Sequence, residues 1–196
     1  MILADRLYAC MQTSELEELL EGQTETQSLE FKGSCAWEAR TFAKDILAMA
    51  NVRDGGWIVV GVEDGTYKRQ GLSEVQIRTF DQETMQDQMA EYADPFVSIQ
   101  VFTPDDKEGR HYVVIKVRPF DDVPVICKKD GLDLQQGAVY YRGKSRRPES
   151  ARIRNSYDVR DLIELATVRM MRRKTEIGFT VIPSDKQKLD SELQGL

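Results

Sequence analysis

Histidine and cysteine are scarce in this chain of 196 residues, which contains one His and three Cys. His111 stands alone and no Cys-x-x-Cys spacing occurs, which argues against a structural zinc site. The cysteines are odd in number and far apart, at Cys10, Cys35 and Cys127, which argues against a disulfide framework. We therefore expect the protein to work in a reducing, cytoplasmic environment.

Long apolar runs are also missing. No stretch approaches the roughly 20 consecutive apolar residues that a membrane-spanning helix needs, so the sequence predicts no membrane partner. Residues 1–5 are not a basic segment followed by a long apolar core, and we expect no secretory signal. The composition, 41% hydrophobic and 31% charged, is ordinary for a globular protein with one sizeable core.

The net charge of −6 conceals an uneven distribution along the chain. Residues 138–174 hold eleven basic and four acidic side chains and carry +7, whereas residues 1–137 carry −11 and residues 175–196 carry −2. A basic segment in an otherwise acidic protein predicts that an anionic partner binds to one face.

The densest basic stretch is a predicted loop that contains Arg142, Lys144, Arg146 and Arg147 next to Tyr141. Basic side chains in such a loop can bind phosphates, and a tyrosine can stack on an unpaired base. We interpret these five residues as nucleic-acid-binding. The alternative interpretation is a solvated loop that keeps the protein soluble.

The hydrophobic pattern predicts an α+β fold, in which several helices cover a mixed sheet. The expected helices are residues 14–20, 36–50, 81–92 and 159–173, and the expected strands are residues 26–32, 57–62, 97–102, 111–117, 123–127 and 138–142. The last four strands form two consecutive antiparallel pairs. We expect one domain over residues 1–178, with its motifs within 21–174, and a polar, flexible tail over residues 179–196.

Three acidic side chains flank two of these elements. Glu25 and Glu30 precede a predicted helix, and Asp64 follows a predicted apolar strand. Glu30 and Lys32 share one face of an extended strand, whereas Glu25 needs a turn or bulge within residues 26–28 to reach that face. Carboxylate oxygens gathered in this way suit Mg²⁺ or Mn²⁺, which can activate a water and stabilise charge on a phosphate.

Each of these pieces also has a purely structural explanation. A Glu and a Lys often share one face of a surface strand, and Asp64 followed by glycine is often only a turn. Glu63 is the rival third acid, although it points to the opposite face of a straight strand. Gly55 and Gly56 precede a strand rather than open a helix, so they form a tight turn and not a Walker-type phosphate loop.

Taken in order, the motifs resemble the Schlafen AlbA_2-type domain over residues 21–173. They are Glu25-x4-Glu30-Phe-Lys32, Ala48-x-Ala50-Asn51, Gly55-Gly56-x-Ile-x-Val-Gly61-Val-x-Asp64-Gly65 and, more loosely, the stretch from Tyr140 through Arg142 to Ser145. The resemblance implies a metal-dependent endoribonuclease that cleaves structured RNA such as tRNA. It implies that Glu25, Glu30 and Asp64 bind Mg²⁺ or Mn²⁺ and that Lys32 assists them.

The nuclease branch of that family in animals has two such lobes and a zinc site, whereas this chain has one lobe and no zinc ligands. The resemblance therefore implies a homodimer that rebuilds a two-lobed cradle for RNA. The main alternative is a non-catalytic nucleic-acid-binding module, such as a DNA- or RNA-binding regulator or adaptor. A nucleotide-binding role is a third hypothesis, and the missing Walker loop argues against it.

Overall fold

The computed structural model describes residues 10–21, 25–143 and 149–179. At its centre is a mixed four-stranded sheet with the strand order β1-β2-β5-β4. Its strands are β1 (Leu29–Lys32), β2 (Gly56–Val60), β4 (Ile99–Phe102) and β5 (Val113–Val117). β1 runs parallel to β2, and β5 runs antiparallel to β2 and β4. The first predicted hairpin is confirmed by the pairing of β4 with β5.

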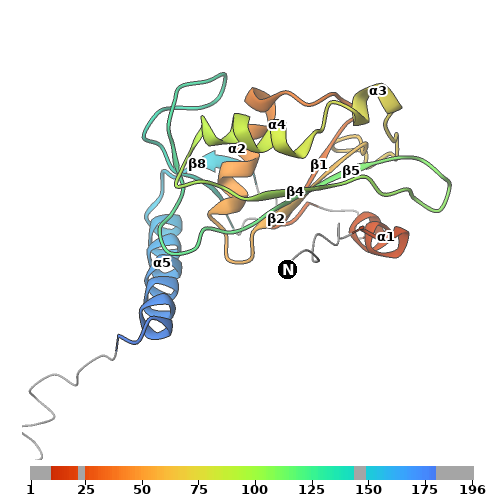
Figure 1. The fold of residues 1–196 in the computed structure, drawn as a ribbon. Helices are drawn as coiled ribbons and strands as arrows, with labels where there is room; N and C mark the ends of the chain where they lie inside the picture. Colours follow the sequence, from red (N-terminus) through yellow and green to blue (C-terminus); the bar gives the residue numbers. More distant parts are fainter. Residues whose placement is uncertain (1–9, 22–24, 144–148, 180–196) are drawn as a thin grey trace, which may run out of the picture.

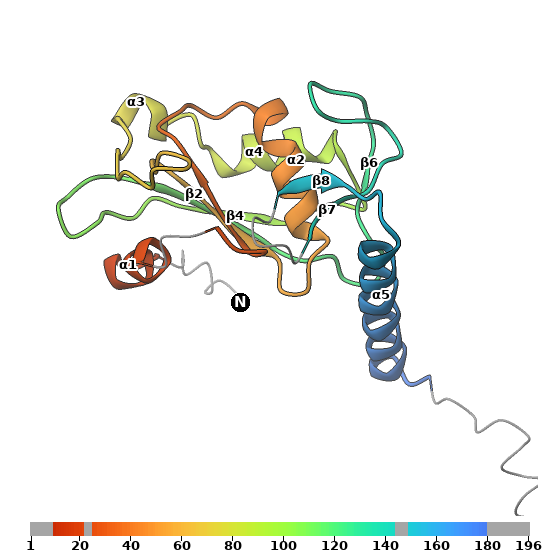
Figure 2. The ribbon, with the colours of Figure 1, turned by 180° about the vertical axis from the view of Figure 1, so that it is seen from behind.

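Helices cover both faces of this sheet (Figure 1). The helices are α1 (Thr13–Glu21), α2 (Ala39–Ala50), α3 (Glu74–Ile77), α4 (Gln82–Ala90) and α5 (Ser156–Glu176). α2 and α4 lie on one face and α1 lies on the other (Figure 2). Because side chains alternate along a strand, Ile58 joins the core beneath α2 while Val59 joins the core beneath α1. The predicted α+β class with a mixed sheet is confirmed.

Two small two-stranded sheets lie beside the main sheet. They pair β3 (Ala93–Asp94) with β6 (Ile126–Cys127), and β7 (Tyr140–Arg142) with β8 (Ser150–Arg152). The predicted pairing of residues 123–127 with 138–142 is therefore wrong. Backbone hydrogen bonds of Cys127 with Gly137 and Ala138, both 2.9 Å, still hold the two segments together. β8 was not predicted because its Ser-Ala-Arg sequence carries no strand pattern.

Several predicted boundaries shift by a few residues. The first strand begins at Leu29 because Gln27 and Ser28 form a turn. α2 begins at Ala39, after Glu38 at its N-cap position. α3 was not predicted; its capping box, Ser73 with Gln76, is the signal for so short a helix.

α5 is longer than predicted and projects away from the sheet (Figure 1). Asn155 caps its first turn by accepting a hydrogen bond from the backbone N–H of Asp158. Among the residues that the structure describes, no helix is long and apolar enough to cross a membrane. The predicted polar tail lies outside the described residues apart from Phe179, which is exposed.

Candidate active site

One cleft of about 850 Å³ brings the predicted acids together. Glu25, Glu30 and Asp64 all line it, and so does Lys32. The walls come from β1, the start of β8, α2 and the loop that follows β2. Glu25 and Asp64, which are 39 positions apart in the sequence, therefore face one space, because β1 and β2 are parallel neighbours in the sheet.

A tight turn ahead of β1 brings Glu25 to this cleft. Thr26 and Leu29 close the turn by exchanging backbone hydrogen bonds of 3.1 and 3.3 Å. The Oε1 atom of Glu25 then accepts a hydrogen bond of 3.2 Å from the backbone N–H of Phe31. The turn that the sequence requires within residues 26–28 is thus present.

The loop after β2 separates the two candidate third acids. Asp64 is exposed and lines the cleft. Glu63 instead accepts hydrogen bonds from Thr66 Oγ1 and, at 3.3 Å, from Gln70 Nε2. Tyr67 of the same loop lines the cleft with a φ of 55°, a left-handed conformation that is uncommon for a bulky residue. The geometry favours Asp64 over Glu63.

Arg142 lies beneath the cleft rather than on the surface. Its side chain is completely buried and donates a hydrogen bond to Glu30 Oε2. Tyr141 is also buried; its hydroxyl bonds to Asp161 and accepts a hydrogen bond of 3.2 Å from Gln27. Burial and the Asp161 carboxylate raise the pKa of Tyr141. Because neither side chain is exposed, Arg142 and Tyr141 are not among the residues that we propose to contact nucleic acid.

The other three predicted nucleic-acid contacts, Lys144, Arg146 and Arg147, lie outside the described residues. Two further cations line the cleft from one side of α2, Arg40 and Lys44. They stand four residues apart, a spacing that places both on the same helix face. The four-residue spacing of Arg40 and Lys44 within the predicted helix 36–50 could have identified this pair from the sequence.

Asp45 is a site residue that the sequence interpretation missed. It is 4% exposed on α2, and its Oδ2 lies 2.7 Å from Lys32 Nζ, which is also 3.7 Å from Glu30 Oε1. Burial lowers the pKa of Lys32, but the charge and hydrogen bond of Asp45, and then the charge of Glu30, outweigh burial and raise it. Lys32 therefore stays a cation. An acid on the apolar face of α2, between Phe42 and Met49, was the available signal.

Glu30 is the most perturbed carboxyl group in the cleft. Burial raises its pKa most, and the charges of Asp45 and Glu25 raise it further. Arg142 and Lys32 oppose these effects, and the pKa of Glu30 comes to about 7. A largely buried carboxyl group among like charges in a cleft is typical of a functional site.

This shift predicts a pH-dependent stability. Between its ordinary pKa of 4.5 and about 7, folded Glu30 keeps a proton that the unfolded chain has lost. The free energy of unfolding should therefore fall as pH rises through this window, by about 3 kcal/mol in total. Glu30→Gln, which cannot ionise, should remove that fall and be more stable than the wild type at about pH 8. Urea unfolding across the window measures both proteins.

Glu83→Gln, on the exposed side of α4, controls for the loss of one carboxylate. It should unfold with the same pH dependence as the wild type. A Glu30→Gln protein that retains the full wild-type slope would contradict the raised pKa.

The carboxylates around the cleft do not form a closed metal cage. Within residues 10–21, 25–143 and 149–179, no three His, Cys, Asp or Glu side chains stand close enough to hold a metal ion. Two of the charged groups are already paired, Glu30 with Arg142 and Lys32 with Asp45. The donor set nevertheless consists of carboxylate oxygens in one cleft, which fits a hard divalent cation.

Comparison with known proteins places this site in a family. No curated protein matches the chain. Among solved structures, the crystal structure of the DIP2311 protein from Corynebacterium diphtheriae is similar, with 19% sequence identity and a TM-score of 0.47. That match covers 69% of this chain and 26% of the DIP2311 chain, so this chain spans about a quarter of that protein. The family model described as Schlafen, AlbA_2 matches residues 25–149, from the first cleft acid to the start of β8. The chain therefore belongs to the Schlafen AlbA_2 family.

Proposed function

We propose that this protein is a divalent-metal-dependent endonuclease that cleaves structured RNA, with tRNA as the first substrate to examine. The observation that carries the proposal is the convergence of Glu25, Glu30 and Asp64, together with Lys32, on one cleft. RNA is preferred over DNA because the Schlafen resemblance of these motifs implies it. Family membership by itself establishes neither cleavage nor substrate.

In this proposal Glu25, Glu30 and Asp64 hold Mg²⁺ or Mn²⁺. The bound ion would supply an activated water and neutralise charge at the scissile phosphate. Glu30 loses its proton more readily when a cation lies beside it, because an opposite charge favours the ionised carboxylate.

The remaining polar groups position these side chains and the phosphate. Lys32 is held as a cation by Asp45, so it stabilises phosphate charge and does not act as a base. Arg142 orients Glu30 from below through a charged hydrogen bond. Arg40 and Lys44 line the cleft where a phosphate backbone would enter, and they attract it electrostatically.

The test incubates the purified full chain with labelled tRNA, another structured RNA and single- and double-stranded DNA. Parallel reactions contain Mg²⁺, Mn²⁺ or EDTA. Cleavage should require metal, and Glu30→Gln and Asp64→Asn should each reduce it at least about 100-fold. Calorimetric titration of Mn²⁺ provides a second readout, in which both variants should bind the ion more weakly than the wild type.

Glu63→Gln is the matched control, because this neighbouring carboxylate bonds within its own loop. It should cleave at close to the wild-type rate. Intact nucleic acid in every reaction, with a mobility shift that survives EDTA, would overturn the nuclease proposal. That result would support the non-catalytic binding module, which the lack of a closed metal cage among the described residues favours.

A further inference from the structure

Helix α5 leaves most of its surface uncovered. Leu162 is the one buried side chain among its 21 residues. Beyond its first turns the helix projects past the sheet (Figure 1). Arg169 anchors the helix by donating hydrogen bonds to the carbonyl oxygens of Phe120 and Arg53, and its guanidinium stacks on the Phe120 ring at 4.4 Å.

One side of α5 carries an exposed apolar stripe. The stripe consists of the exposed Val159, Ile163 and Met170, of Ala166, which is partly buried against the core, and, just past the helix, of the exposed Ile177. Val159, Ile163 and Met170 are 40, 59 and 39% exposed, and Ile177 is 66% exposed. The first four positions follow one another at intervals of four, three and four residues, which is the spacing of a seam between two helices. Exposing such an apolar stripe to water is unfavourable for a monomer, and exposed apolar patches are typical of binding surfaces.

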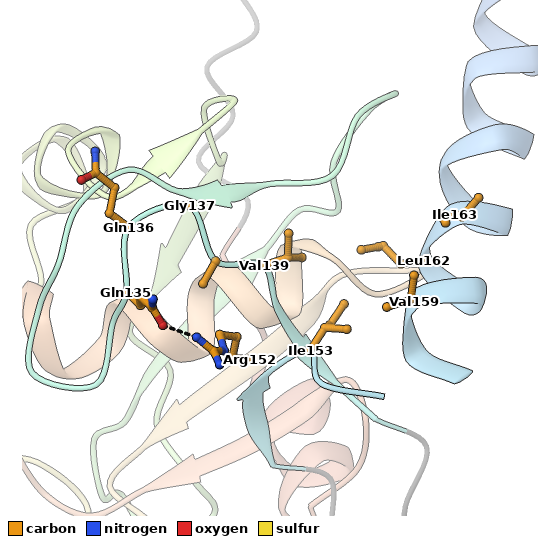
Figure 3. Close-up of a pocket in the computed structure, with 10 residues that line it drawn as sticks. Gln135, Gln136, Gly137, Val139, Arg152, Ile153, Val159, Leu162 and Ile163 are labelled. Carbon is orange, nitrogen blue, oxygen red and sulfur yellow. Dashed lines mark hydrogen bonds between the residues drawn. The ribbon is translucent and has the colours of Figure 1, made fainter. Parts of the chain in front are cut away.

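A groove continues the stripe onto the body of the protein at the N-terminal end of α5. Its volume is about 440 Å³. Figure 3 shows Val159 and Leu162 reaching from α5 toward Val139 and Ile153, which form the opposite wall. In the C-terminal half of α5, Arg169 and Arg173 contact the body of the protein, whereas Met170 and Met171 stand exposed. The N-terminal half of α5 therefore borders a groove, and Met170 and Met171 form a ridge on the C-terminal half.

We propose that this face binds the same face of a second copy of the chain, with the two α5 helices antiparallel. A two-fold axis near Ala166 places the ridge of each copy against the groove of the other, so both halves are covered at once. In this arrangement Ile163 of one copy lies against Met170 of the other. Val159, Ile163, Ala166 and Met170 of each copy contribute to the apolar seam, and Arg173 follows Met170 at the next seam position.

The charges of α5 favour the antiparallel orientation. Its first half, residues 156–166, holds three acids and one arginine, a net charge of −2. Its second half, residues 167–176, holds four basic residues and one acid, a net charge of +3; of these, Arg169 and Arg173 also bond to their own chain, and Arg172 and Lys174 remain for a partner helix. A parallel pair would place like charges side by side, whereas an antiparallel pair places the acidic half against the basic half.

Sedimentation equilibrium of the full chain tests this proposal independently of nuclease activity. The wild type should have the mass of two chains. Ile163→Asp and Met170→Asp should each weaken dimerisation at least about 100-fold, because a charge would enter a buried seam. Val75→Asp is the matched control, since Val75 is 77% exposed on α3, and it should leave the dimer intact. Circular dichroism should show all three variants folded.

Cysteine cross-linking determines the orientation, in a background without Cys10 and Cys35. Ala166→Cys should form a disulfide between two copies under mild oxidation, whereas Val159→Cys should not, because its counterpart lies at the far end of the seam. Cross-linking of both would overturn the antiparallel arrangement. A monomeric wild type would overturn the dimer, and dimerisation only after removal of residues 180–196 would assign the stripe to that segment.

Discussion

Replacing Arg142 by methionine should lower the free energy of unfolding by about 3–5 kcal/mol at about pH 8, because Glu30 loses its charged partner in a largely buried position and must either stay ionised beside Lys32 alone or take up a proton at that pH. Arg142 also donates hydrogen bonds to Ser150 Oγ at 3.2 Å and to the carbonyl oxygens of Thr26 and Leu29 at 3.0 and 3.2 Å. These bonds hold the turn ahead of β1, so their loss should loosen the wall that carries Glu25. Urea unfolding measures the stability.

Two further measurements identify the cause of this loss. At about pH 5 Glu30 is protonated, so the loss should be smaller than at about pH 8. The double variant Glu30→Gln, Arg142→Met should lose less stability than Arg142→Met alone, because it has no carboxyl group at position 30 to keep ionised or to protonate. Arg40→Met is the matched control on the exposed rim of the cleft and should change stability by no more than about 0.5 kcal/mol. Equal stability of Arg142→Met and the wild type would contradict the role of Arg142 as the anchor of Glu30.

Asn51→Ala should lower the free energy of unfolding by about 2–4 kcal/mol. Asn51 is completely buried at the end of α2. Its Nδ2 donates to the carbonyl oxygens of Val125 and Tyr140, both at 2.9 Å, and its Oδ1 accepts from the backbone N–H of Val125 at 2.7 Å. Alanine would leave all three backbone groups buried and without a partner. Thermal and urea unfolding measure the loss.

Gln100→Ala, on the exposed side of β4, is the control for Asn51 and should be close to the wild type. A loss below about 1 kcal/mol for Asn51→Ala would mean that water or a small rearrangement satisfies the three backbone groups. Because Asn51 fixes the start of β7, which ends at Arg142, the variant should also weaken metal binding in the cleft. Asn51 is thus connected to the cleft acid Glu30 through β7, which runs from Tyr140 to Arg142.

Local patterns in the sequence were sufficient to predict the main elements of the fold. The alternation in residues 97–117 predicted the β4–β5 hairpin, and the apolar run after Gly56 predicted the buried central strand. Both signals arise within a few residues and do not depend on the rest of the chain. The pairing of β7 was not predictable in this way, because β8 is a short, polar segment whose extended conformation depends on its pairing with β7.

The candidate site, like the fold, was only partly predictable from the sequence. Motif order in the sequence indicated the family and predicted the three candidate acids, and the need for a turn before Phe31 followed from strand geometry alone. Only the tertiary structure decided that Arg142 faces inward to Glu30 and that Asp45 holds Lys32; it also places Asp64, which the motif already favoured over Glu63, in the cleft. The physical reason is that burial and charge pairing depend on segments brought together from more than 100 residues apart, and a linear pattern of basic residues does not reveal which of them the fold will enclose.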